Sequence, residues 1–326
     1  MILWRKQAGV AALVLMLFFA TARCGMASGL IAAVGIENQY ADIIHQIGGN
    51  FVSVTAIITN PNTDPHTFEV SPKIVGKITS ASLIVENGLG YDAWANKIIE
   101  AAPSRRRRII NVQHLLGFPN SAPNPHFWYD PKAIPVVAKA IAHDLATLDP
   151  AHAAYFDERE HRFDDSLQAW TAAITSFKTR YPDTPVAVTE PVADYMLQAL
   201  GAHIETPFTL QLAIMNGTDP SPQDIAAENA LLREHKVKAF VYNRQVMTPL
   251  TESFLNTAKK NGVPVVAVYE TMPTPGYDFQ SWMLAEIQAL TKAVAMGTST
   301  ESLLPASAPP SNRSSFLTRI AHALKC

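Results

Sequence analysis

The chain of 326 residues is predicted to be an α/β protein with two doubly wound lobes joined by one long helix. Strand-like and helical segments alternate along both halves, and such alternation is typical of mostly parallel sheets covered by helices. A single long helical pattern over 150–180 separates the halves. With 48% hydrophobic and 17% charged residues the chain can bury a large core, and its length favours two domains over one.

The first half combines apolar, strand-like runs with amphipathic segments. Isoleucine and tyrosine side chains recur at helical spacing over 36–47, until Gly48 and Gly49 stop the pattern. The run over 51–58 is rich in β-branched residues, as strands are. We expect strands over 30–34, 51–58, 81–85 and 109–112, and helices over 36–47, 72–79, 91–101 and 131–147.

Residues 150–180 are predicted to form one connecting helix. Phe156, Phe163, Leu167, Trp170, Ile174 and Phe177 are spaced by seven, four, three, four and three residues. A helix of this length is about 45 Å long, which is long enough to act as a rigid connector. In the second half we expect strands over 186–188, 208–214, 239–242 and 263–269, and helices over 192–200, 222–235, 249–260 and 279–296.

The remaining segments complete the predicted organisation. Residues 1–27 have the features of a signal peptide, because Arg5 and Lys6 precede a short apolar run and possible cleavage sites follow Ala22 and Ala27. The lobes are placed at 28–149 and 181–297. Residues 298–326 are rich in serine, proline and alanine and are expected to form a flexible tail.

The charge composition of the chain restricts which partners it is expected to bind. Lysine and arginine number 26 against 28 aspartates and glutamates. The run Arg105 to Arg108 stands between a helical and a strand-like segment, which indicates a solvated turn rather than a phosphate-binding surface. We therefore expect no nucleic acid partner. Removal of the signal peptide leaves a net charge of −4 or −5, and a mildly acidic exported protein suits a cationic ligand.

Four potential metal ligands follow predicted strands: His66, His126, Glu190 and Glu270. Each histidine comes directly after a proline, which fixes its own φ and restricts the preceding residue. In α/β sheets, ligands bind beyond the carboxyl ends of the strands, where loops converge. Two imidazoles and two carboxylates can bind one divalent cation such as Mn²⁺, Zn²⁺ or Fe²⁺.

Simpler roles exist for each of these residues. A loop histidine commonly serves a turn, and Glu190 or Glu270 can be favoured by the dipole of the helix that follows. The coincidence of four such side chains at equivalent places in four βα units favours a metal site.

These motifs resemble a known family, the metal-binding receptors of zinc and manganese ABC importers, also called cluster A periplasmic binding proteins. The resemblance covers about residues 30–297 and rests on Asp64-Pro65-His66-x-Phe68-Glu69, on Asn124-Pro125-His126-x-Trp128-x-Asp130-Pro131, and on the long helix that opens at Asp149-Pro150. It implies that the family's four ligands correspond to His66, His126, Glu190 and Glu270. It also implies a metal site in the cleft between the lobes, a periplasmic location and delivery of the ion to a membrane permease with its ATPase. We expect a monomer.

Some positions depart from the family pattern. A histidine-rich insertion, frequent in zinc members ahead of the second ligand, is missing, since 113–124 holds only His114. Glu190 replaces a histidine that many zinc members carry, and Glu270 replaces a more common aspartate. In Tyr242-Asn243-Arg244-Gln245, relatives tend to place an acidic residue. These departures affect the identity of the metal rather than the prediction that one binds.

A metallohydrolase and a surface protein are alternatives to a metal carrier. A metallohydrolase keeps an open coordination position for water, whereas four protein ligands close the shell. The sequence contains no H-E-x-x-H, G-x-S-x-G, G-x-G-x-x-G or phosphate-loop motif, so we predict a carrier and not an enzyme. An adhesin or surface protein of the same fold stays open as an alternative.

Overall fold

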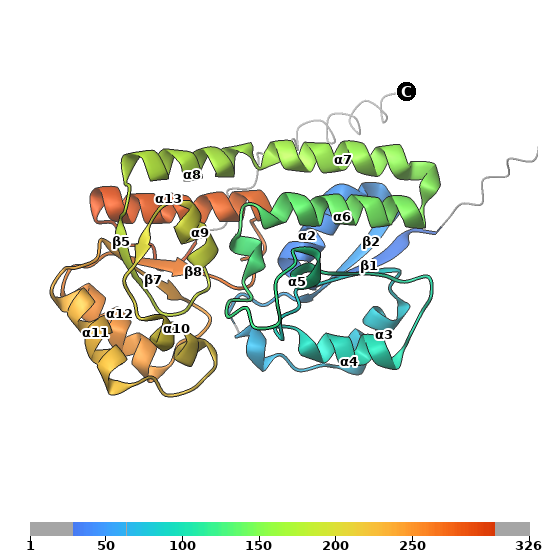
Figure 1. Ribbon diagram of the computed structural model, residues 1–326. Helices are drawn as coiled ribbons and strands as arrows, with labels where there is room; N and C mark the ends of the chain where they lie inside the picture. The colour runs from blue at the N-terminus through green and yellow to red at the C-terminus, as the bar shows by residue number, and fades with distance from the viewer. Residues whose placement is uncertain (1–28, 63, 304–326) are drawn as a thin grey trace, which may run out of the picture. The chain divides into compact units, whose positions relative to one another are not determined.

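The computed structural model describes residues 29–62 and 64–303. The predicted signal peptide and most of the predicted tail lie outside these residues. The helices and strands of the described residues belong to one compact unit that begins at Ile31. It contains two parallel sheets of four strands each, which confirms the predicted fold class (Figure 1).

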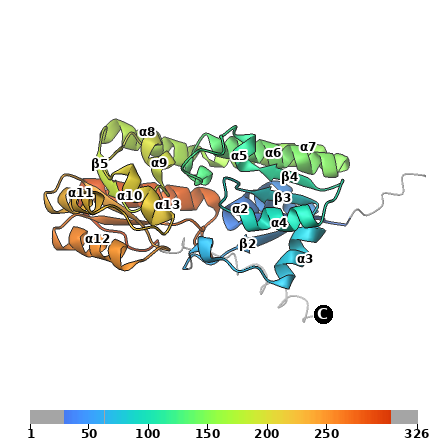
Figure 2. The ribbon, with the colours of Figure 1, turned by 60° about the horizontal axis from the view of Figure 1, so that its bottom comes forward.

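The first sheet has the strand order β2-β1-β3-β4. Its strands are β1 (Ile31–Glu37), β2 (Val52–Ile58), β3 (Leu83–Glu86) and β4 (Arg108–Asn111). The helices of this lobe are α2 (Asn38–Gly48), α3 (Pro72–Ser80), α4 (Ala93–Ala101), α5 (Val112–Leu115) and α6 (Ala133–Leu148). Figures 1 and 2 show α6 on one face of the sheet and α3 and α4 on the other.

Helices on both faces explain why these strands read as continuous apolar runs rather than alternating ones. Along β1, Ala33 joins the larger core, whereas Val34 and Ile36 belong to a second, smaller cluster that includes Ile78 of α3 and Ile99 of α4. Successive side chains of a strand point to opposite faces, so each strand needs apolar residues at every position.

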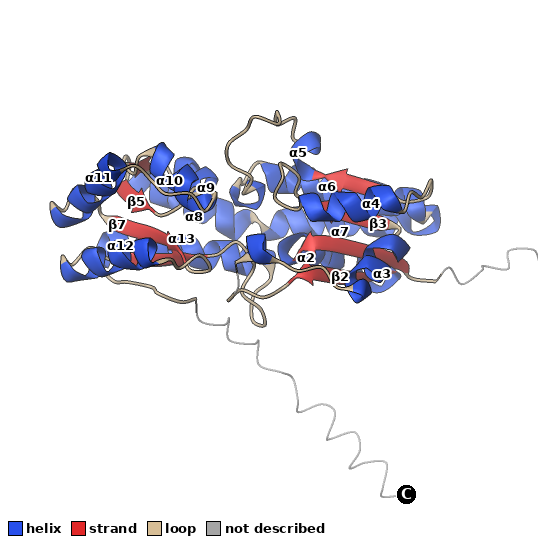
Figure 3. Cartoon of the chain, turned by 90° about the horizontal axis from the view of Figure 1, so that it is seen from below, coloured by secondary structure: helices blue, strands red, loops and turns tan. Residues whose placement is uncertain are grey.

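The second sheet has the order β6-β5-β7-β8. Its strands are β5 (Pro185–Val188), β6 (His203–Ile204), β7 (Ala239–Asn243) and β8 (Val265–Val268). The helices are α9 (Asp194–Ala199), α10 (Phe208–Met215), α11 (Pro222–Arg233), α12 (Pro249–Lys260) and α13 (Phe279–Met296). Figure 3 shows the strands of each lobe lying among helices. In each sheet the second strand in sequence pairs with one side of the first strand and the third strand pairs with the other side, which creates a switch point where ligands of such sheets commonly bind.

The predicted single helix over 150–180 is two helices, α7 (Ala153–Ser166) and α8 (Gln168–Arg180), after a short 3₁₀ turn (Pro150–His152). Leu167 interrupts them because its N–H donates to the carbonyl of Asp164 (3.1 Å), three residues back rather than four. Ser166 Oγ also donates to the carbonyl of Phe163 (2.5 Å), a contact that competes with regular helix geometry. The first of the pair packs against α6 and the second against α13 (Figure 1).

Two other predictions are corrected. Residues 208–214 were predicted as a strand but form α10, in which Leu210, Gln211 and Ile214 are buried at helical spacing. The predicted flexible tail begins too early, because residues 299–303 lie along β8. Thr300 N donates to the carbonyl of Val265 and its own carbonyl accepts from Ala267 N, both at 2.8 Å. Leu303 is buried, and its backbone N donates to Tyr269 Oη at 3.3 Å.

The buried carboxyl of Glu286 forms a hydrogen bond between the lobes. Glu286 of α13 accepts from Trp282 Nε1 and lies 2.8 Å from Tyr129 Oη, which belongs to the 3₁₀ helix Phe127–Tyr129 of the first lobe. Burial raises the pKa of Glu286 to about 8, although hydrogen bonds from Tyr129 and Trp282 oppose the shift. The carboxyl is therefore neutral in the folded protein near pH 7.

We expect Glu286→Gln to flatten the pH dependence of stability. Above pH 4.5 the unfolded chain has lost the Glu286 proton, whereas the folded chain still holds it because the pKa of Glu286 is raised. The free energy of unfolding therefore falls as pH rises towards 8. The loss amounts to about 1.4 kcal/mol per pH unit, and glutamine mimics the neutral form. Melting temperatures of the metal-free proteins between pH 6 and 8 measure this, and parallel curves would contradict it.

Candidate metal site

The four predicted ligands all follow strands. His66 lies in the 3₁₀ helix Pro65–Thr67 after β2, and its side chain lies outside the described part of the structure. His126 immediately precedes the 3₁₀ helix Phe127–Tyr129. Glu190 and Glu270 stand two residues beyond the last residues of β5 and β8. The parallel sheets thus present these loops at their carboxyl ends.

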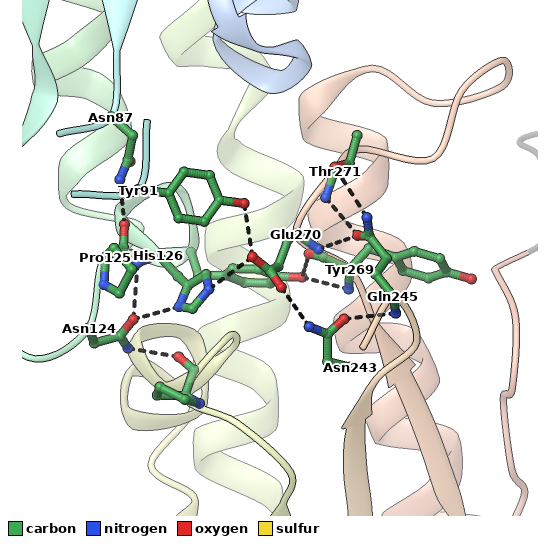
Figure 4. Close-up of polar contacts among 12 residues, drawn as sticks. Asn87, Tyr91, Asn124, Pro125, His126, Asn243, Gln245, Tyr269, Glu270 and Thr271 are labelled. Carbon is green, nitrogen blue, oxygen red and sulfur yellow. Dashed lines mark hydrogen bonds and ion pairs between the residues drawn. The ribbon is translucent and has the colours of Figure 1, made fainter. Parts of the chain in front are cut away.

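His126 and Glu270 come from different lobes and meet in the interior. The His126 Nε2 to Glu270 Oε2 distance is 3.4 Å, and both side chains are fully buried (Figure 4). His126 Nδ1 lies 2.7 Å from Asn124 Oδ1. An amide oxygen can only accept, so Nδ1 carries a proton, and in the neutral imidazole Nε2 presents its lone pair towards Glu270. A buried lone pair that faces a carboxylate is suited to bind a cation.

Asn124 ties this histidine to the second lobe. Its Oδ1 also accepts from the backbone N of His126 (3.0 Å), and its Nδ2 donates to the carbonyl of Pro191 (2.7 Å). Pro191 directly follows Glu190, so one amide side chain fixes the tautomer of His126 and the loop that carries the third predicted ligand. Such outer hydrogen bonds orient metal-binding histidines.

Glu270 is held from both lobes. Tyr91 Oη donates to Oε2 (2.9 Å) and Asn243 Nδ2 donates to Oε1 (2.6 Å). Gln245 Oε1 accepts from the backbone N of Glu270 (2.7 Å), and Gln39 Nε2 donates to its carbonyl (3.2 Å). These partners leave Oε2 oriented towards His126.

Glu190 is 3% exposed and supplies a second buried carboxyl. Neither of its oxygens accepts a hydrogen bond of ordinary geometry from a described residue. Burial raises the pKa of Glu190 well above its usual value, the charge of Glu270 raises it further, Asn243 lowers it and Asp64 adds a smaller increase. Two carboxyls that repel each other in a buried site can both be ionised when a cation lies between them.

The structure does not bring all the predicted ligand atoms together. Within residues 29–62 and 64–303, the only His, Cys, Asp or Glu group with three ligand atoms inside 4.8 Å is Asp157, Glu160 and His161. Asp157 and His161 are exposed on α7, and these three residues are paired with one another. His126 and Glu270 are thus in contact. Glu190 is close enough for the charge of Glu270 to raise its pKa, but the three side chains do not form a compact group.

A cleft of about 740 Å³ lies beside this site. Leu89, Tyr91 and Pro125 line it from the first lobe, and Leu212 and Met215 line it from the second. Tyr91 lines the cleft and donates to Glu270, so the cleft lies next to a residue that contacts the carboxylate. A cavity of about 780 Å³ between α6 and α7 contains none of the four predicted ligands.

Sequence reasoning did not identify the amide and tyrosine side chains around Glu270. Gln39, Tyr91 and Gln245 follow strands, as the predicted ligands do, but nothing in their spacing marks them as site residues. Asn243 offered the clearest signal, since it stands at the end of a predicted strand in a segment that departs from the family pattern.

The fold and the site define a solute-binding protein of a metal-type ABC importer. The chain belongs to the family described as zinc-uptake complex component A, periplasmic, whose model matches residues 37–293. No helix within the described ranges is long and apolar enough to cross a membrane.

Individual proteins agree with this assignment. The metal ABC transporter substrate-binding lipoprotein FimA of Streptococcus parasanguinis is 26% identical over 283 residues, which cover 81% of this chain and 89% of FimA. The periplasmic zinc-binding protein TroA of Treponema pallidum superimposes with a TM-score of 0.69 at 17% identity, covering 83% of this chain and all of that one. The solute-binding protein FpvC of Pseudomonas aeruginosa in complex with Mn²⁺ gives a TM-score of 0.65 at 20% identity, covering 82% and 98% of the two chains.

Proposed function

We propose that this protein binds one divalent transition-metal ion in the cleft between its lobes and delivers it to an ABC importer. The observation that carries the proposal is the buried contact between His126 Nε2 and Glu270 Oε2 at 3.4 Å, with the carboxyl of Glu190 close by. We assign the ligands as His66, His126, Glu190 and Glu270. The ion is cargo, so the protein's task is to hold it and release it.

The donor chemistry supports this assignment. His126 offers Nε2 as the donor atom of its neutral form, because Asn124 holds the proton on Nδ1. Glu190 and Glu270 offer carboxylate oxygens in a site whose net charge a divalent cation would balance. Imidazole and carboxylate together suit Mn²⁺, Fe²⁺ and Zn²⁺.

The same arrangement favours a carrier over an enzyme. Four protein ligands would complete the coordination shell and leave no position for an activated water. We further propose that residues 1–27 direct export, that the mature protein works outside the cytoplasm as a monomer, and that a membrane permease with its ATPase receives the ion. These proposals follow from family membership and from the sequence of the N-terminus.

Titration of metal-free protein tests the proposal directly. One equivalent of Mn²⁺ or Zn²⁺ should bind per chain, and deletion of the gene should lower metal uptake by cells. Unchanged uptake together with reduced adherence would support the adhesin alternative. Turnover of model esters or peptides by the metal-loaded protein would support an enzyme instead.

Metal affinity should weaken as pH falls. The raised pKa of Glu190 means that the metal-free site keeps a proton that an incoming ion must displace, and imidazole must also be unprotonated to coordinate. Each displaced proton costs about tenfold in affinity per pH unit. Dissociation constants at pH 8 and 5.5 should therefore differ by at least about tenfold, whereas equal values would show that no ionisable ligand takes part.

A further inference from the structure

The order of strands in the second sheet places one residue between the two proposed carboxylate ligands. The order β6-β5-β7-β8 makes β7 the neighbour of both β5 and β8. Glu190 follows β5, Glu270 follows β8, and Asn243 is the last residue of β7. Because parallel strands end at the same edge, the side chain of Asn243 lies between the loops that carry the two glutamates.

The contacts of Asn243 agree with this position. Its Nδ2 donates to Glu270 Oε1 at 2.6 Å, and its Oδ1 accepts from the backbone N of Gln245 at 2.9 Å. Its own backbone N donates to Thr189 Oγ1 at 3.0 Å, and Thr189 immediately precedes Glu190. Asn243 is 1% exposed, so water cannot replace these partners (Figure 4).

The amide character of this residue suits its place between two carboxyl-bearing loops. A carboxylate at position 243 would repel both glutamates, whereas the amide donates a hydrogen bond to Glu270 without adding charge. The hydrogen bond from the backbone N of Gln245 to Oδ1 fixes which end of the amide faces Glu270.

We propose that Asn243 is a positioning residue of the metal site, which rests on the proposed function above. By holding Oε1 of Glu270, Asn243 directs Oε2 towards His126 Nε2, and its backbone N holds Thr189, the residue before Glu190. It therefore sets the geometry of the bound ion without touching the ion itself.

Asn243→Ala tests the proposal, with Asn256→Ala as a matched control on the exposed face of α12. Affinities for Zn²⁺ and Mn²⁺ come from competition with a chelating dye, and the visible spectrum of the Co²⁺-saturated protein reports ligand geometry. Loss of an outer hydrogen-bond partner typically costs 10–100-fold in metal affinity. We expect that loss and an altered cobalt spectrum in Asn243→Ala, and neither in the control.

An affinity within twofold of wild type, or a weaker affinity with an unchanged cobalt spectrum at saturation, would overturn the proposal. Circular dichroism of the metal-free protein shows whether the variant folds. If the alanine variant does not fold, Asn243→Ser serves, because its hydroxyl is too short to reach Glu270, and the same two outcomes apply. Wild-type protein that binds no metal would instead refute the proposed function, so the two failures are distinguishable.

Discussion

Replacement of His126 by alanine is expected to abolish metal binding near neutral pH, with affinity reduced by well over about 100-fold, more than the loss of an outer partner causes. The reason is geometric, since Nε2 of His126 is the imidazole nitrogen that faces Glu270 at 3.4 Å. Without it, Glu270 loses the nitrogen that it faces across the lobes. Elemental analysis of purified protein after dialysis against trace metal measures the effect.

Controls for this variant must separate binding from folding. The ring of His126 packs edge-on against Trp128, with centroids 5.3 Å apart, and against Tyr91 at 6.0 Å, so its removal also loosens the core. His143→Ala provides a matched control, because His143 is exposed on α6 and away from the four proposed ligands. A folded His126→Ala protein that keeps its full metal content would exclude the proposed site.

The fold was predictable because its strands and helices are short and regularly alternate. Parallel strands buried on both faces read as apolar runs, and helices between them show a period near 3.6. The error at 208–214 has the same origin, because a short apolar run with few charged neighbours has a similar pattern whether it forms a strand or a helix. Leucine, glutamine, alanine and methionine favour a helix there, and the positions of Leu210 and Ile214 confirm it.

The approximate place of the site was predictable from strand ends, but its geometry was not. Topological reasoning placed His126 and Glu270 at the edges of their sheets, and the structure has them in contact across the lobes. The assignment of all four ligands stays a prediction. Tyr91 could not be inferred, because its hydrogen bond to Glu270 joins residues of different lobes and depends on how the lobes pack.

The proposed donor set favours some ions over others. Glu190 in place of a third histidine shifts the donor set towards oxygen, which suits Mn²⁺ and Fe²⁺ better than an all-nitrogen set would. Intrinsic affinity favours zinc over manganese at most such sites, so the metal that co-purifies with the protein is poor evidence of what it transports. We propose manganese or iron as the transported ion, and stabilisation of the metal-free protein as the readout.

Manganese is expected to raise the melting temperature of the metal-free protein by several degrees. A ligand at 100 times its dissociation constant adds about 2.7 kcal/mol to the free energy of unfolding, and 1 kcal/mol shifts the melting temperature of a chain this large by roughly 2 °C or more. Glu190→His restores a nitrogen donor, so this variant should lose most of the manganese shift and keep the zinc shift. If millimolar manganese leaves the wild-type melting temperature unchanged while micromolar zinc raises it, zinc is the cargo and Glu190 does not select for manganese.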